Sequence, residues 1–177
     1  MSTTTWALDP SHSELQFKVK HLMITTVTGS FTDFTVSATT EGDDFTKSSI
    51  SFSAKTGSVN TNSEQRDGHL KSADFFDAEK FPEISFKSTG FEATSDASEF
   101  KLKGDLTIKD VTKPVVLNVE FGGVNKDPWG NLKAGFTLNG KINRTDWGLN
   151  WNAALETGGV LVSEEVRLLA EIQLVKA

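Results

Sequence analysis

Apolar and polar residues alternate along almost the whole chain, and this pattern limits its possible folds more than any other feature. A period of two is typical of β-strands, in which successive side chains point to opposite faces. Eight segments with this period predict eight strands, at residues 15–19, 27–38, 50–54, 84–93, 100–108, 115–121, 132–142 and 166–174.

Two of these segments change face partway along. The apolar phase shifts between Phe31 and Phe34, which predicts a β-bulge with one extra residue near Thr32–Asp33. A similar slip separates Phe86 from Phe91. We therefore expect irregular register at both places.

Long strands and regular turn signals, such as DPWGN at residues 127–131, predict an all-β fold, either an eight-stranded antiparallel up-and-down barrel or a sandwich. The polar face carries many lysines and glutamates, which do not fit inside an eight-stranded barrel, so we expect the apolar face inside. A transmembrane barrel with inverted faces is the alternative, and the short loops count against it. The length of 177 residues favours one domain, over residues 1–177.

The segment RDGHLKSADFFDAEKFPEISF, at residues 66–86, breaks the alternation and gathers charges, a histidine and phenylalanines. A helix of two or three turns is predicted within residues 60–80, with Asn62 or Ser63 as its N-cap. Pro82 then releases the chain into the next strand. We expect this helix to lie across one mouth of the barrel.

The composition excludes several kinds of protein. The chain has no cysteine, which excludes disulfides, thiolate metal sites and cysteine nucleophiles. A net charge of -6 without a basic segment argues against a nucleic-acid partner. No apolar run approaches the ~20 residues of a membrane-spanning helix, so we expect no stable membrane insertion. The sequence MSTTTWALDP shows no signal peptide, which predicts a cytoplasmic protein, or a periplasmic one if the sequence is a trimmed mature form.

The three histidines, His12, His21 and His69, lack the spacing of a metal site, and we expect neither a metal nor a cofactor. His69 could act as a general base oriented by Asp67 or Asp74, but no nucleophile motif such as G-x-S-x-G accompanies it. We therefore predict no catalytic residue. The alternative is an enzyme that acts on a lipid, with His69, Asp67 and His12 as acid–base groups.

Charged and aromatic residues around the predicted helix are candidates for the mouth of the barrel. Cationic side chains there would receive an anionic head group, for which arginine is suited, or would only form a solvated helix face. The phenylalanines would line the entrance or anchor the helix. The candidate mouth residues are Arg66, His69, Lys71, Phe75, Phe76 and Phe81. A second cluster consists of Arg144, Asp146 and Trp147. We interpret it mainly as a strand-end lock, a group of side chains that fixes the end of the strand before it, and secondly as part of the rim of the barrel mouth.

Several motifs, in one order, match a known family. They are WALDPSHSELQFKVKHL at 6–22, V-x-G-x-F-x-x-F at 27–34, RDGHLKSADFFD at 66–77, FPEISF at 81–86, GDLTIKDVTKPVVL at 104–117 and GFTLNGKINRTDWGL at 135–149. Through these motifs nearly the whole chain resembles the YceI-like proteins, a lipocalin-like group of polyisoprenoid-binding proteins. The resemblance implies an eight-stranded barrel with a helix in the 66–86 segment, an apolar tunnel for a long isoprenoid or similar lipid, a homodimer and no catalytic residues. Many members are secreted to the periplasm, whereas this sequence shows no signal peptide.

Together these observations predict non-enzymatic binding, carriage or sequestration of a long apolar lipid in the barrel lumen, either a polyisoprenoid or a fatty-acid derivative. Burying one five-carbon unit contributes up to roughly 4 kcal/mol, at about 0.8 kcal/mol per methylene-sized group. A fully packed barrel that serves as an interaction module is a further alternative. The residues predicted to line the tunnel are Phe17, Val19, Phe31, Phe52, Phe86, Leu102, Leu106, Leu117 and Phe136.

Overall fold

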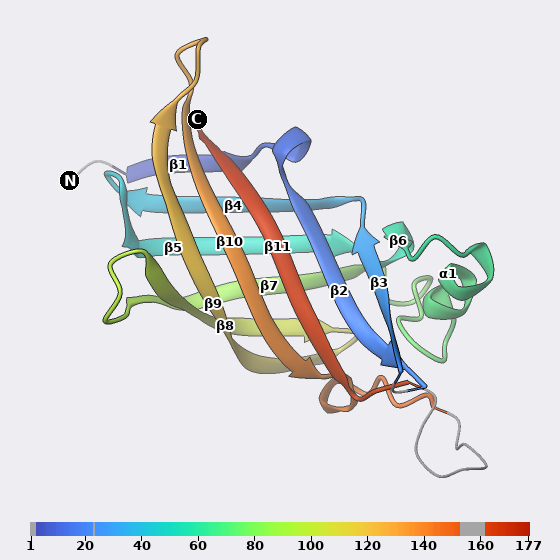
Figure 1. Cartoon of the computed structure of the whole chain (residues 1–177). Coiled ribbons are helices and arrows are strands. Elements are labelled where there is room, and N and C mark those ends of the chain that lie inside the picture. The colour runs from blue at the N-terminus through green and yellow to red at the C-terminus, as the bar shows by residue number, and fades with distance from the viewer. Residues whose placement is uncertain (1–2, 23, 153–161) are drawn as a thin grey trace.

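The computed structural model describes residues 3–22, 24–152 and 162–177, and Figure 1 shows them as an antiparallel sheet that closes into a barrel. The described residues contain one α-helix, α1 (Glu64–Lys71), and three short 3-10 turns, η1 (Pro10–His12), η2 (Thr56–Ser58) and η3 (Arg144–Trp147). The strands are β1 (Thr3–Leu8), β2 (Glu14–His21), β3 (Thr25–Phe31), β4 (Phe34–Glu41), β5 (Asp44–Lys55), β6 (Val59–Asn60), β7 (Glu83–Ala93), β8 (Glu99–Ile108), β9 (Val111–Lys126), β10 (Leu132–Asn143) and β11 (Glu165–Lys176).

Eight strands close the barrel, in the order β1-β4-β5-β7-β8-β9-β10-β11, with β1 paired back to β11. The neighbouring strands are antiparallel, and the ring follows the order of the chain. β2 and β3 extend the sheet beside β11, which pairs with β1 through residues 174–176 and with β2 through residues 167–171. The eight-stranded antiparallel barrel predicted from the sequence is confirmed.

All eight predicted segments lie in strands, but two details differ. Residues 27–38 form two strands, β3 and β4, instead of one bulged strand, because the two halves pair with different neighbours, β2 and β1. The sequence pattern also does not reveal β1, whose TTTWAL sequence contains only one large buried side chain, Trp6. The slip between Phe86 and Phe91 is confirmed as a register shift between Ser88 and Gly90.

The predicted helix is α1, which follows the N-cap Ser63. The Ser63 hydroxyl accepts a hydrogen bond from the backbone N–H of Arg66 at 3.3 Å. Eight residues give about two turns. α1 lies at one end of the barrel, beyond β3 and β6 (Figure 1), and β7 begins directly after Pro82. The predicted turn at 127–131 joins β9 to β10.

The inner face of the barrel is apolar, as the strand pattern predicts, and one of its two ends is tightly packed. Phe45 lies at the centre of this packing, with ring centroids 4.9 to 6.4 Å from those of Trp6, Phe91, Phe121 and Phe136. We call this group the Phe45 cluster. Phe45 is the second residue of β5, which begins at the end of the barrel away from α1 (Figure 1), and the larger of the remaining spaces in the lumen is lined by residues of α1. Within the described ranges, no helix is long and apolar enough to cross a membrane.

Candidate functional site

The barrel contains two adjoining cavities. The larger one, which we call the outer cavity, has a volume of about 530 Å³ and is bounded by α1 and the residues after it. The inner cavity, of about 140 Å³, lies deeper, against the Phe45 cluster. Four residues line both cavities and form the junction between them: Leu15, Phe52, Leu106 and Leu168.

The inner cavity is almost entirely apolar. Of its described lining residues, only Asn139 has a polar side chain, and none is charged. This follows from the strand pattern, because the inward positions of the strands around it are leucine, valine, isoleucine, alanine and phenylalanine. A polar ligand group would lose its hydrogen bonds to water in this cavity, whereas an apolar chain would lose nothing.

The segment after α1 inserts a phenylalanine into the outer cavity. Phe76 packs edge-on against Phe31 of β3, with centroids 5.7 Å apart, and Phe31 packs against Phe17 of β2 at 5.5 Å. The backbone N–H of Phe76 donates to the carbonyl of Leu70 at 2.9 Å, which ties this segment to the helix. Phe17 covers Gly29, where a Cβ would lie 2.3 Å from the ring, so a larger residue at this position would displace the ring that forms this wall of the cavity.

A second aromatic group, next to Phe76, lies in the wall of the outer cavity. The ring of His69 lies 5.1 Å from Phe75 and 4.5 Å from Trp151, and both contacts are T-shaped. The guanidinium carbon of Arg144 lies 5.9 Å from the centre of the Phe75 ring. The wall thus combines aromatic surface with a cation, an arrangement in which each stabilises the other.

Arg144 places a buried positive charge in this wall. The residue is 3% exposed and donates to four backbone carbonyls at 2.6 to 3.3 Å, those of Leu149, Trp151, Val162 and Ser163. No carboxylate of the described residues forms an ion pair with it. Burial lowers the pKa of the guanidinium, and the charge of Glu164 opposes this shift. An arginine stays protonated under such conditions, so its charge is balanced mainly by carbonyl dipoles.

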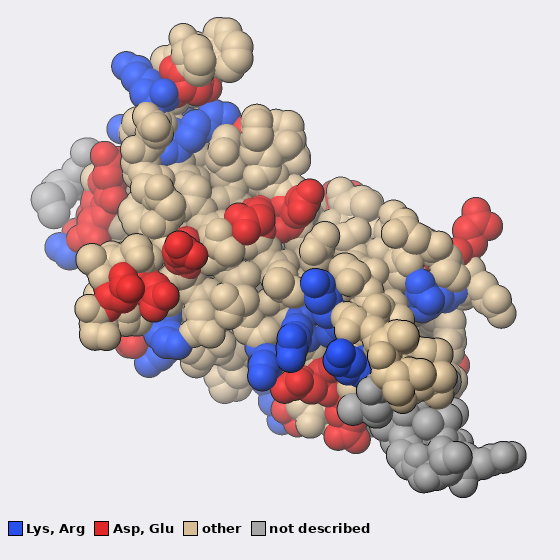
Figure 2. All heavy atoms as spheres, viewed as in Figure 1, with Lys and Arg blue, Asp and Glu red and all other residues tan. Residues whose placement is uncertain are grey.

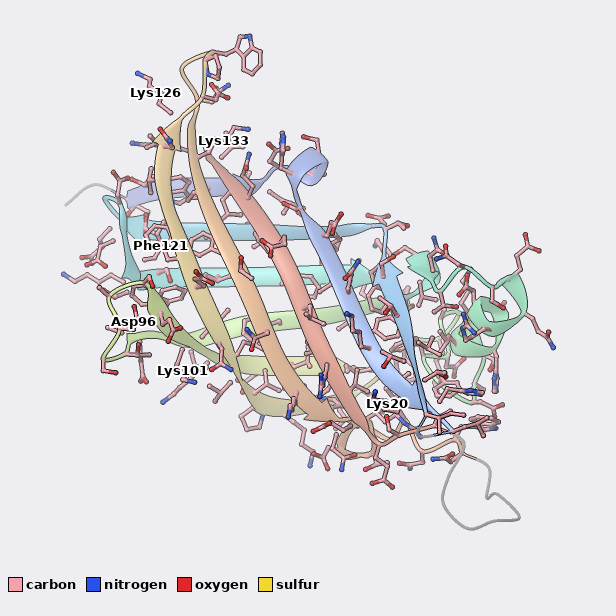
Figure 3. The ribbon with its side chains drawn as sticks, in the orientation of Figure 1. Lys20, Asp96, Lys101, Phe121, Lys126 and Lys133 are labelled. Carbon is pink, nitrogen blue, oxygen red and sulfur yellow. The ribbon has the colours of Figure 1, made fainter. Side chains whose placement is uncertain are left out.

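The charged residues that line the outer cavity have one sign. The described lining residues include Lys20, Arg66 and Arg144, with His21 and His69, and they include no aspartate or glutamate. Lys20 and Arg66 are exposed, so the cavity reaches the surface beside them, and Figure 3 shows Lys20 at the end of β2 that lies toward α1. In a chain of net charge -6, this lining would favour an anionic group over a cationic one.

All nine residues predicted for the tunnel line one or both cavities. Those in the outer cavity alone are Phe17, Val19 and Phe31. Those at the junction are Phe52 and Leu106, and those in the inner cavity alone are Phe86, Leu102, Leu117 and Phe136. Ligand contact at these positions stays a prediction.

The six candidate mouth residues divide into two groups. Four line the outer cavity, namely Arg66, His69, Phe75 and Phe76. The other two, Lys71 and Phe81, line neither cavity. The contribution of Trp151 was missed, because it follows the last turn after β10 and belongs to no periodic pattern. The carbonyl bonds of Arg144 agree with the strand-end lock expected for it.

The structure does not assemble the three residues of the acid–base alternative. Of the two carboxylates considered as partners of His69, Asp74 pairs with it at 2.9 Å, as one of the two alternatives expected. Asp67 instead accepts hydrogen bonds from the backbone and hydroxyl of Thr61, at 2.8 and 2.6 Å. His12 pairs with Asp9 in η1, and of the three only His69 lines a cavity. Among the described residues there is also no group of three or more potential metal ligands.

This closed eight-stranded antiparallel barrel belongs to the class of small barrels whose interior has room for packed side chains or for one small ligand. Within this class, the chain belongs to the YceI-like domain family, whose sequence model matches residues 6–174. A UPF0312 protein of Staphylococcus aureus strain MSSA476 is 41% identical over 171 residues, which is 96% of each chain.

Solved structures of similar proteins share the fold. A Campylobacter jejuni YCEI protein aligns with a TM-score of 0.77 at 34% identity, over 90% of this chain and 91% of that one. Burkholderia cenocepacia BcnA aligns with a TM-score of 0.81 at 18% identity, over 94% and 98% of the two chains. A polyisoprenoid binding domain from Saccharophagus degradans aligns with a TM-score of 0.68 at 15% identity, over 97% and 98%. The two more distant likenesses concern the fold alone.

Proposed function

We propose that this protein binds a long apolar lipid, a polyisoprenoid or a fatty-acid derivative, inside its barrel and carries or sequesters it without chemical change. The observation that carries the proposal is the lumen itself, in which an apolar inner cavity adjoins a larger outer cavity that reaches the surface. The fold shared with a polyisoprenoid binding domain supports the choice of ligand class.

The size of the lumen suggests a chain of moderate length. At roughly 30 Å³ per water- or methylene-sized group, the outer cavity of about 530 Å³ has room for about 18 such groups. This corresponds to three or four isoprene units or a common fatty acyl chain. Burial at about 0.8 kcal/mol per group gives an upper limit of about 14 kcal/mol, from which several kcal/mol of association cost are subtracted.

The charges in the outer cavity suggest how the lipid lies. An apolar tail has its best surroundings at the inner end of the outer cavity, where the four described residues of the junction carry no charge. A polar head would lie near the surface, beside Arg66 and His69, with Arg144 in the wall behind it. We therefore propose that the tail points toward the Phe45 cluster and the head toward α1.

A charge placed at the junction tests the proposal. Phe52→Asp would put a carboxylate where the two cavities meet, and we expect affinity for a fluorescent prenyl or fatty acyl probe to fall at least tenfold. Lys101→Asp, on the exposed face of β8, is the control and should bind within about twofold of the parent protein. Equal binding by both variants, at comparable melting temperatures, would contradict ligand binding in the lumen.

The homodimer and the cytoplasmic location expected from the sequence stay predictions. Light scattering of the purified protein measures the first, and fractionation of the source cells measures the second.

A further inference from the structure

A row of cations crosses the outer face of the barrel next to the outer cavity. In the strand register, Lys141 of β10 lies opposite Arg167 of β11, and Arg167 lies opposite Lys18 of β2. Lys20 follows Lys18 on the same face and also lines the outer cavity. We call these four residues the basic row. Figure 2 shows Lys and Arg side chains gathered over the parts of β2 and β11 nearer to α1.

The basic row is poorly neutralised. Among the described residues, only Lys141 has an ion-pair partner, Glu165, and their charged atoms are 3.8 Å apart. The amino group of Lys20 donates to the hydroxyl of Thr26 at 3.0 Å, which does not balance its charge. The other three cations form no ion pair among the described residues, and of these Lys20 and Arg167 are exposed while Lys18 is half-buried, in a chain of net charge -6.

Most of the charges on these two strands are sorted by sign. Farther from α1, Glu14 of β2 lies opposite Glu171 of β11, so an acidic pair follows the basic pair of Lys18 and Arg167. Like charges directly opposite each other destabilise a sheet, and exchanging one residue between the two pairs would remove both repulsions. Folding stability therefore does not explain the arrangement. Glu165, the first residue of β11, also lies toward the cavity and pairs with Lys141, so this end of the outer face is mainly positive, whereas the end with Glu14 and Glu171 is negative.

Exposed apolar side chains lie at the same end. Of the described residues between β2 and β3, Leu22 is 37% exposed and Ile24 is 76% exposed. Lys20 and His21, directly before these residues, line the outer cavity. Cationic side chains next to exposed apolar ones are typical of surfaces that bind reversibly to anionic bilayers.

From the basic row and the exposed apolar side chains beside it, we propose that this row, together with Leu22 and Ile24, forms a docking face for an anionic lipid bilayer, which brings the mouth of the lumen to the membrane surface. The proposal rests on the proposed function for its purpose, since docking would serve the loading or delivery of the lipid. Binding is reversible and needs no membrane-spanning segment.

Vesicle co-sedimentation tests this face directly. The full-length protein should bind vesicles of equal parts phosphatidylglycerol and phosphatidylcholine at low salt, and binding to phosphatidylcholine alone should be at least tenfold weaker. Because each cation near an anionic surface contributes roughly a fivefold factor in affinity, Lys18→Gln with Arg167→Gln should weaken binding about 25-fold. Ile24→Ser should weaken binding and leave its salt dependence unchanged.

A matched control carries the same change in charge elsewhere. Lys113→Gln with Lys126→Gln also moves the net charge from -6 to -8, at two exposed lysines outside the basic row, and should bind within about twofold of the parent. Lys126 lies at the end of the barrel away from Lys20 (Figure 3). The Lys18→Gln, Arg167→Gln variant should melt at the same temperature as the parent or higher, because a repulsion is removed.

Three results would overturn the docking face: no binding of the parent protein to anionic vesicles, equal loss of binding in the control variant, or a clear loss of stability in the Lys18, Arg167 variant. The outcomes for docking and for the lumen are separable. If the protein binds anionic vesicles but its lumen takes up no lipid, only the proposed function is refuted. If the lumen holds a lipid but the protein does not bind anionic vesicles, only the docking face is refuted.

Discussion

Removing the ring of Phe52 should lengthen the lipid that the barrel accepts. Phe52 lies at the junction of the two cavities, so Phe52→Ala would join them and add at least the 140 Å³ of the inner cavity to the space beyond the mouth. At roughly 30 Å³ per methylene-sized group, this is room for about five more groups, or one isoprene unit. Full burial of such a unit contributes up to roughly 4 kcal/mol, and a third of that is already a tenfold gain in affinity.

The assay is competition among prenyl chains of three to six isoprene units, read by native mass spectrometry. We expect the preferred length to shift upward by one unit in Phe52→Ala. The variant should also lose about 2–3 kcal/mol of unfolding free energy, less than for a fully buried phenylalanine, because this ring already borders empty space.

Phe34→Ala is the matched control for this experiment. Phe34 packs against Phe52 with centroids 6.3 Å apart, but it lines neither cavity. Its loss should lower stability without changing the preferred length. An unchanged length preference in Phe52→Ala, or an equal shift in Phe34→Ala, would refute the assignment of Phe52 as the divider of the lumen.

Two further predictions concern the barrel itself. Gly104→Ala should lower the unfolding free energy by about 1–3 kcal/mol in chemical denaturation, because its Cβ would lie 2.4 Å from both the carbonyl oxygen of Lys87 and the ring of Phe86. Gly57→Ala is the control and should have little effect, because a Cβ there would have no atom within 4 Å. Equal losses of stability in the two variants would contradict the packing argument. Hydrogen bonds, first of all from Lys133, hold the pKa of Asp9 well below its usual range. The ionised Asp9 carboxylate therefore stabilises the fold fully above pH of about 4, and this stabilisation is lost as the pH falls below that value. We expect the unfolding free energy of Asp9→Asn to be lower than that of the parent protein at neutral pH and to depend less on pH below 4. Parallel curves for parent and variant would contradict this role.

The lumen was largely predictable because it depends on strand periodicity. Inward positions such as Phe17, Leu102 and Phe136 follow from the alternation alone, and all three line a cavity. The division of the lumen into two cavities could not be predicted from the alternation, because it depends on how the Phe45 cluster packs across the barrel. Phe45 itself lies in the DFTKSS part of β5, where no alternation marks it.

The residues around the mouth were harder to predict, because their positions depend on tertiary contacts. Phe75 and Phe76 turn inward through hydrogen bonds of the segment after α1, whereas Phe81, five residues farther on, lines neither cavity. Lys71, in the last turn of α1, is exposed, although Arg66 and His69 of the same helix line the outer cavity. Periodicity alone does not tell which face of so short a helix points to the lumen.

The sorting of charge on β2 and β11 also needs the register. Lys18 and Arg167 are far apart in the sequence, and their juxtaposition appears only when the strands are paired. The composition, with its net charge of -6, even points away from an anionic partner. A local surface of opposite sign to the whole chain is a feature that only the three-dimensional structure reveals.

The central claim is that the lumen holds a lipid, and the most direct test is the mass of the protein as it is purified. Native mass spectrometry under non-denaturing conditions should show an adduct that disappears on denaturation, and organic extraction should recover an apolar lipid. From the volume of the outer cavity, we expect a chain of about 15 to 20 carbons. Repeated isolation of the protein at the mass of its bare chain, with no binding of added prenyl or acyl chains, would contradict the account.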